Sequence, residues 1–360
     1  MIEKLILVLV FLILPHFLKC QCNEECQNRT VFGYEAGNAG TGSHVSFFGF
    51  QAGAKNTIGY DNSFFGFQAG QKNTDGFGNS FFGVDAGKDN DDGSNNSFYG
   101  RSAGSKNLVG GSNSFFGRDA GRSNTYGSLN SFFGQAAGRQ NTVGQGNSFF
   151  GAISGLFHRI GDFNSFFGEA AGFASFEGNF NSFYGAFAGY SIVGDSCVAI
   201  GANSGPTQMS QISNRLFIDV KRSDEPLIYG EFDNDLVRVN GTFEAMGVSN
   251  NSDVRLKERI RPVDPISILD KILELPISEW SYKNDDIRHI GPMAQDFHST
   301  FNLGKGETTI TTIDVDGVSL VGIQALNQKL NEENKILSDT VEELLERIEL
   351  LESRVFGKRE

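Results

Sequence analysis

The sequence predicts a mainly β protein: a trimeric β-solenoid or β-roll, then a small α+β domain and a C-terminal trimeric coiled coil. Three observations support this: a repeat of 17 residues, adjacent phenylalanines in most repeats, and heptads near the C-terminus. The composition agrees, because 34 Phe and 45 Gly in 360 residues are unusual for a globular enzyme.

The repeat occupies residues 31–205. Glycines recur every 17 residues from Gly49 to Gly185, with 16-residue steps from Gly33 and to Gly201, and the unit N-S-F-F-G-x-x-A-G-x-x-N-T-x-G occurs about eleven times. A period of this kind indicates a solenoid, in which each unit buries its apolar face against its neighbours. Seventeen residues are too few for a helical pair, but they suit one turn of a β-solenoid, with short strands broken at glycine corners.

Adjacent phenylalanines predict how each turn is filled. Successive side chains of a strand point to opposite faces, so one ring of Phe64-Phe65 or Phe81-Phe82 enters the coil and the other leaves it. The outward rings would form an aromatic ladder larger than a soluble monomer usually exposes. Packing three solenoids around one axis would bury that ladder.

Other functions for the repeats have weaker support. Calcium-binding repeats need the motif GGxGxD, whereas aspartate occurs only sporadically in these repeats. An ice-binding face needs a regular array of threonines, and the repeats supply only a partial one. Dinucleotide and hydrolase motifs are absent, so we expect no cofactor and no metal. The net charge of −13 and the lack of clustered Lys and Arg in the repeats argue against nucleic acid as a partner.

The N-terminus predicts secretion or display at the cell surface. Residues 1–20 resemble a signal peptide, because Lys4 precedes an apolar run that Pro15 interrupts before it reaches the ~20 residues of a membrane span. The mature chain would keep Cys22, Cys26 and Cys197, an odd number that leaves one thiol unpaired or bridging chains.

Residues 206–251 lose the period and predict a β-rich adaptor that ends in a cleavable linker. The tract 247–251 is short and polar. Immediately after it, Ser252 and Lys257 stand five residues apart, a spacing compatible with a Ser-Lys dyad. The local alternative is a serine that caps a helix starting near Arg255, with lysine on the solvated face.

Three ordered motifs make a family resemblance: SDVRLKERI at 252–260, GPMAQDF at 291–297 and DVDGVSLVGIQALNQKL at 314–330. They resemble the C-terminal intramolecular-chaperone domain of phage endosialidases and tail fibres, over residues 252 to about 340. The resemblance implies a domain that trimerises, assists the upstream fibre and releases itself by cleavage. It implies Ser252 as nucleophile, Lys257 as general base, and a cut between Asn251 and Ser252. The unit CVAIGANSG at 197–205 also resembles the head repeats of trimeric autotransporter adhesins.

The dyad needs a neutral amine, and a free lysine has a pKa near ~10.4. We expect burial in a trimer and the charges of Arg255 and Arg259 to disfavour the ammonium form, whereas Asp253 would favour it. Side chains five residues apart diverge by roughly 140° on an ideal helix, so Ser252 should precede the helix.

The remaining chain predicts a chaperone domain at 252–322 and a coiled coil at 323–355. A helix is expected from Ile266 to Leu275, and the domain core is expected to include Trp280, Tyr282, Ile290, Met293 and Phe297. His289 and His298 are expected at the edges of that core. Heptad positions d and a are occupied by Ile323, Leu330, Leu337, Leu344 and Leu351, and by Asn327, Asn334, Val341, Ile348 and Val355.

The sequence therefore predicts a secreted or surface homotrimeric fibre with a self-releasing chaperone, which cuts itself once in cis. The first alternative is a non-cleaving structural surface or adhesion protein with a C-terminal trimerisation domain. The second is a solenoid with its own activity. A surface or glycan ligand of the solenoid is a possible partner.

Overall fold

The structure is a computed structural model that describes residues 28–283 and 286–357. The described chain divides into two compact units, with the division between Glu244 and Ala245. The predicted signal peptide, and with it Cys22 and Cys26, lies outside the described residues. The two units are described separately below.

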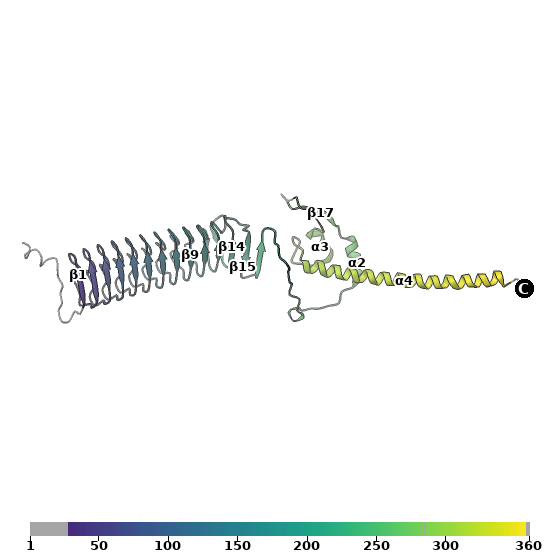
Figure 1. The fold of residues 1–360 in the computed structure, drawn as a ribbon, viewed down its shortest axis with the longest axis horizontal. Coiled ribbons are helices and arrows are strands. Elements are labelled where there is room, and N and C mark those ends of the chain that lie inside the picture. The colour runs from purple at the N-terminus through teal and green to yellow at the C-terminus, as the bar shows by residue number, and fades with distance from the viewer. Residues whose placement is uncertain (1–27, 284–285, 358–360) are drawn as a thin grey trace, which may run out of the picture. The chain divides into compact units, whose positions relative to one another are not determined.

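The first unit is a β-solenoid, as predicted. Each turn contributes one short strand to a 14-stranded sheet, and neighbouring strands are parallel along the repeats (Figure 1). Phe64 of one turn pairs with Phe47 of the preceding turn and with Phe81 of the next. The parallel strands are β1 (Arg29–Phe32), β2 (Val45–Phe48), β3 (Ser63–Phe65), β4 (Ser80–Phe82), β5 (Ser97–Tyr99), β6 (Ser114–Phe116), β7 (Ser131–Phe133), β8 (Ser148–Phe150), β9 (Ser165–Phe167), β10 (Ser182–Tyr184), β12 (Val198–Ile200) and β14 (Arg215–Ile218).

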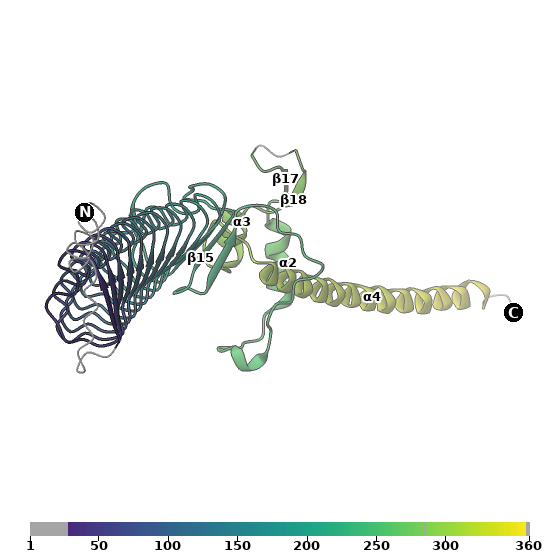
Figure 2. The same ribbon diagram turned by 60° about the vertical axis from the view of Figure 1, so that its left-hand side comes forward.

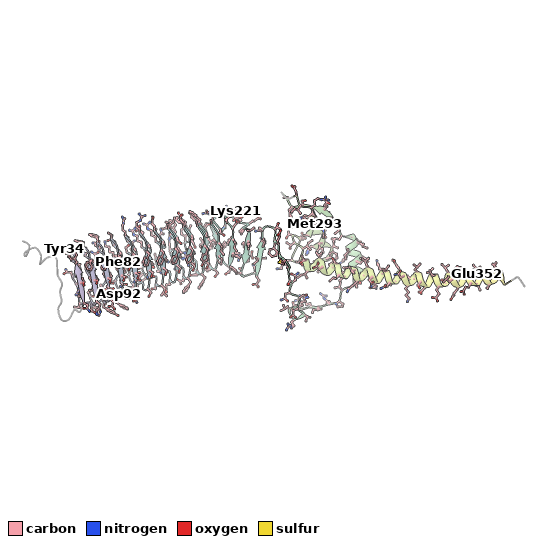
Figure 3. All side chains as sticks on the ribbon, in the orientation of Figure 1. Tyr34, Phe82, Asp92, Lys221, Met293 and Glu352 are labelled. Carbon is pink, nitrogen blue, oxygen red and sulfur yellow. The ribbon has the colours of Figure 1, made fainter. Side chains whose placement is uncertain are left out.

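Two aromatic columns follow from the alternation of strand side chains. The first ring of each doublet is fully buried, and rings one turn apart stack with centroids 4.6–4.9 Å apart; they run from Phe47 to Phe183. The second ring lies on the outer face at similar spacing, as Phe82 does in Figure 3. Outer rings are only partly covered, and Tyr184 is 44% exposed. The predicted inward and outward rings are confirmed.

Two ladders of buried asparagines run through the interior of the solenoid. In the N-T ladder, Asn73 Nδ2 donates to Asn56 Oδ1 at 2.7 Å and to Gly76 O at 2.9 Å. In the N-S ladder, the Asn79 backbone amide donates to Asn62 Oδ1 at 2.9 Å. Buried polar groups are costly unless they are hydrogen-bonded, so these asparagines tie adjacent turns together.

Glycine after the doublet is required by the stacking itself. Gly66 has φ +145°, and a Cβ there would lie 2.3 Å from the carbonyl oxygen of Gly83 in the next turn. Both the backbone angle and the close approach exclude larger side chains. This explains why the repeat keeps glycine at this corner.

The solenoid sheet continues beyond residue 205. β14 adds in parallel to β12, and the antiparallel strands β15 (Ile228–Glu231) and β16 (Leu236–Val239) follow it. A separate parallel pair joins β11 (Ile192–Val193) to β13 (Ser210–Gln211). The antiparallel hairpin ends the stack of parallel strands.

The second unit contains the short helix η2 (Val254–Leu256), the helices α2 (Pro265–Glu274), α3 (Ala294–Phe301) and α4 (Thr312–Phe356), and the hairpin of β17 (Ser278–Trp280) and β18 (His289–Gly291) (Figure 2). Its buried apolar residues are Leu269, Phe297, Phe301 and Ala325. The expected core is therefore partly wrong. Phe297 is buried, but Tyr282 and Ile290 are 65% and 77% exposed, because they belong to the hairpin region rather than to the helices that pack together.

Helix α4 spans 45 residues without a break, and Glu352 marks its C-terminal part in Figure 3. Its d positions are exposed: Ile323 by 64%, Leu330 by 55% and Leu337 by 63%. A long helix with an uncovered apolar seam fits a coiled coil. Within the described part of the chain, none of the helices combines the length and apolarity of a membrane span.

Candidate functional site

The segment at 251–257 is a loop followed by one short turn of helix. Asp253 caps η2, with its carboxylate accepting a hydrogen bond from the Arg255 amide at 2.9 Å. The helix ends at Leu256, and Lys257 has an extended backbone. The local alternative from the sequence, a helix capped by Ser252 and carrying lysine on its side, is therefore wrong, because Asp253 makes the cap and the helix stops before Lys257.

The structure brings the two predicted site residues together. Lys257 Nζ donates to Ser252 Oγ at 2.6 Å. Ser252 lies in the loop before η2, as expected, and the extended backbone at Lys257 lets its side chain point back toward it. Both residues are exposed in the isolated chain.

The charges beside this pair are largely neutralised by one another. Arg255 contacts the Asp253 carboxylate through Nη2 at 2.6 Å and Nε at 3.0 Å. These hydrogen bonds lower the pKa of the Asp253 carboxyl and raise the pKa of the Arg255 guanidinium. Arg259 lies 3.5 Å from Glu258. Each of the two arginines therefore has a carboxylate partner next to it.

The two histidines of this unit, His289 and His298, contact residues outside the Ser252–Lys257 pair. His289 stacks on Trp280 with ring centroids 4.7 Å apart, and His298 Nδ1 lies 2.8 Å from the Leu303 carbonyl oxygen. Among the residues that the structure describes, neither ring hydrogen-bonds to Ser252 or Lys257. Among those residues, no cluster of three or more His, Cys, Asp or Glu is arranged to hold a metal ion.

The residue before the pair is equally accessible. Asn251 is exposed, and its side-chain oxygen accepts a long hydrogen bond of 3.4 Å from the Asp253 amide. The peptide bond between Asn251 and Ser252 thus lies in an exposed loop directly beside the hydroxyl. Sequence reasoning found both side chains but missed the Asp253–Arg255 pair, for which acid and base two residues apart are the only signal.

Comparison with known proteins adds one finding. No curated protein and no solved structure matches the chain. A family model, however, matches a segment that begins at Ser252 and ends one residue after α3. Residues 252–302 of this chain are similar to the family described as Chaperone of endosialidase.

Proposed function

We propose that residues 252 to 360 are an intramolecular chaperone that assembles three solenoids into a fibre and then releases itself by cleavage between Asn251 and Ser252. The observation that carries the proposal is the family match starting at Ser252, together with the 2.6 Å contact between Lys257 Nζ and Ser252 Oγ. We place the fibre outside the cell or on its surface, because the sequence begins with a predicted signal peptide.

Uncovered apolar surface supports assembly. The apolar seam of α4 needs partner helices, and the outer aromatic column of the solenoid is only partly covered. A further apolar groove of about 300 Å³ in the second unit is lined by Val263, Ile268, Phe301, Leu303, Ile313 and Val318. Large exposed apolar patches mark interaction surfaces. A homotrimer would cover the α4 seam, the outer aromatic column and the apolar groove.

The chemistry of release follows from the order of the residues. Lys257, as a neutral amine, takes the Ser252 hydroxyl proton while Oγ attacks the Asn251 carbonyl carbon. The Asn251–Ser252 C–N bond breaks, the Ser252 nitrogen receives that proton, and an ester joins the Asn251 acyl group to Oγ. Water then hydrolyses the ester, which leaves a carboxylate on Asn251 and a free hydroxyl on Ser252. Each chain reacts once.

We expect assembly of the trimer to bury the Ser252–Lys257 pair, which is exposed in the isolated chain. A lysine amine becomes neutral near pH 7 only when burial or nearby cations disfavour its charge. Both side chains are exposed in one chain, so we infer that partner chains cover the pair in the trimer. Cleavage would then report correct assembly, because the productive geometry and the low dielectric arise together.

The test is the intact mass of the purified full chain, with N-terminal sequencing of any C-terminal piece. A piece that begins at Ser252 supports the proposal, and a trimer that stays uncut favours the second candidate, a non-cleaving structural or adhesion protein. Exposure of the dyad is the observation that favours this candidate. Both candidate functions are compatible with a surface or glycan ligand that binds to the solenoid.

A further inference from the structure

A groove on the solenoid gathers basic side chains. It has a volume of about 450 Å³, and its basic lining comes from four successive turns: Lys106, Arg122, Arg139 and Arg159. Gln140 and Thr142 lie among these cations. The expectation that Lys and Arg do not cluster in the repeats is therefore wrong.

The cluster is hidden in the sequence because its members occupy different repeat positions. Arg122 and Arg139 stand immediately after the A-G pair, Lys106 one residue later, and Arg159 at the threonine of N-T. No single position of the repeat unit carries a basic residue in every turn. Stacking of the turns, with Phe ring centroids 4.8 Å apart from turn to turn, brings the four staggered positions to one groove.

Most of these cations lack a carboxylate partner. Arg122 Nη1 lies 3.7 Å from Asp119, whereas Lys106, Arg139 and Arg159 make no ion pair within the described ranges. Earlier turns differ: Lys72 pairs with Asp89 at 2.8 Å. No acidic side chain lines the groove itself. The Arg159 guanidinium lies over the Phe176 ring, 5.8 Å from the ring centroid, but it has no carboxylate partner. In a protein of net charge −13, three neighbouring cations without a carboxylate partner are unexpected on structural grounds.

We propose that this groove binds an acidic polysaccharide, whose carboxylate or sulfate groups contact the cations along the solenoid axis. Arginine presents a planar fork of donors that matches an oxyanion. Ser123, Gln140 and Thr142 can hydrogen-bond to sugar hydroxyls between those charges. One cation for each turn suits a chain that carries about one charge for each sugar unit. The proposal is independent of cleavage and assembly.

Nucleic acid fits the groove less well. Duplex DNA carries one charge per about 1.7 Å of its axis, far denser than one cation per 4.8 Å turn. Single strands are usually held by stacking bases on aromatic rings, and none of the lining residues is aromatic. The overall negative charge also repels a densely charged polymer at long range.

The test is calorimetric titration of the full-length protein with oligogalacturonate, dextran sulfate, neutral dextran and oligothymidylate. The groove variant replaces three cations with residues that other repeats carry at the same positions: Lys106→Gln, Arg139→Gln and Arg159→Thr. The control removes three cations elsewhere on the solenoid, again using repeat residues: Lys55→Gln, Arg101→Gln and Arg118→Gln. Both variants change the net charge equally.

We expect the wild type to bind at least one acidic polysaccharide, more weakly as salt increases, and not to bind neutral dextran. The groove variant should bind at least about tenfold more weakly, and the control should bind as the wild type does. Tighter binding of oligogalacturonate would identify the anion as a carboxylate, and tighter binding of dextran sulfate would identify it as a sulfate. Arg139→Gln alone serves as the probe should the triple variant unfold.

Three results would overturn the proposal. These are no binding of either acidic polysaccharide, equal loss of affinity in the groove variant and the control, and tighter binding of oligothymidylate than of both polysaccharides. The last result would assign the groove to nucleic acid.

Discussion

Lys257 Nζ and Ser252 Oγ lie 2.6 Å apart across a three-residue helical turn. On a continuous α-helix these side chains would diverge by roughly 140°. The structure avoids this because Ser252 precedes η2 and Lys257 follows it in an extended conformation. The pair is thus built by the end of a short helix, and each residue can be tested separately.

Lys257→Met should give an uncut chain that still assembles, because it removes the proposed base but keeps much of the side-chain volume. The matched control is Arg259→Met, which removes a neighbouring cation that does not contact Ser252. Mass spectrometry of both purified proteins is the measurement. Cutting at Ser252 in the Lys257 variant would rule out the dyad, since a host protease does not need that lysine.

Asp253→Asn should change the pH dependence of cleavage without abolishing it. Asparagine can still cap η2, but it leaves Arg255 without its carboxylate. The guanidinium, no longer balanced by a carboxylate, then disfavours an ammonium at Lys257. The variant should therefore reach a given cleavage rate at a lower pH than the wild type does. Cleavage rates of freshly folded protein across a pH series measure the shift. A complete loss of cleavage would mean that Asp253 has an obligatory role.

Leu344→Glu should dissociate the fibre protein, because it places a charge at a d position that a coiled coil buries. Ser353→Glu introduces the same group at an f position, which a coiled coil leaves exposed, and should have little effect. Sedimentation equilibrium of both variants gives the oligomeric state. A wild-type chain that is monomeric at micromolar concentration would contradict the proposed trimer.

Synthesis of a chain that ends at Asn251 should yield aggregated protein, whereas removal of residues 252–360 after folding should not. The reason is that the C-terminal unit is proposed to bring three chains into register before the solenoids stack. Soluble yield and sedimentation are the readouts. If the shortened chain is as soluble as the full one, the chaperone role fails.

The solenoid should lose stability as the pH falls from about 6.5 to about 4. His158 takes the place of an asparagine in the N-T ladder, is fully buried, and hydrogen-bonds to the Ser175 carbonyl at 2.7 Å. Burial lowers its pKa from 6.5 to about 4, so the unfolded state binds the proton more readily in this window. Stability is therefore complete above pH 6.5 and decreases by about 3 kcal/mol toward pH 4.

His158→Asn is the matched variant for this prediction. Beside His158 the ladder is interrupted, and both side-chain polar atoms of Asn141 are buried without a hydrogen-bond partner among the described residues. Asparagine at 158 can donate to Asn141 Oδ1 as Asn73 does to Asn56. Thermal unfolding across pH should show a smaller decrease for this variant. An equal decrease would assign the effect to carboxylates instead.

Much of the fold follows from local rules that act along the chain. A 17-residue period with Phe doublets predicts stacked strands and two aromatic columns, because side chains alternate across any strand. Glycine at Gly66 is explained by its positive φ and by the approach of the next turn. The apolar seam of α4 likewise follows from a seven-residue pattern, and Ser252 and Lys257 were found from their spacing and the motif around them.

Other features depend on which groups meet in space. The exposure of Tyr282 and Ile290 is one such feature. Another is the gathering of Lys106, Arg122, Arg139 and Arg159 from successive turns, which follows no period of the sequence. Sequence patterns describe which face a residue occupies within its own element. Distances between charges, and the burial of a side chain by a different element, arise only when turns and helices pack, and tertiary structure alone decides them.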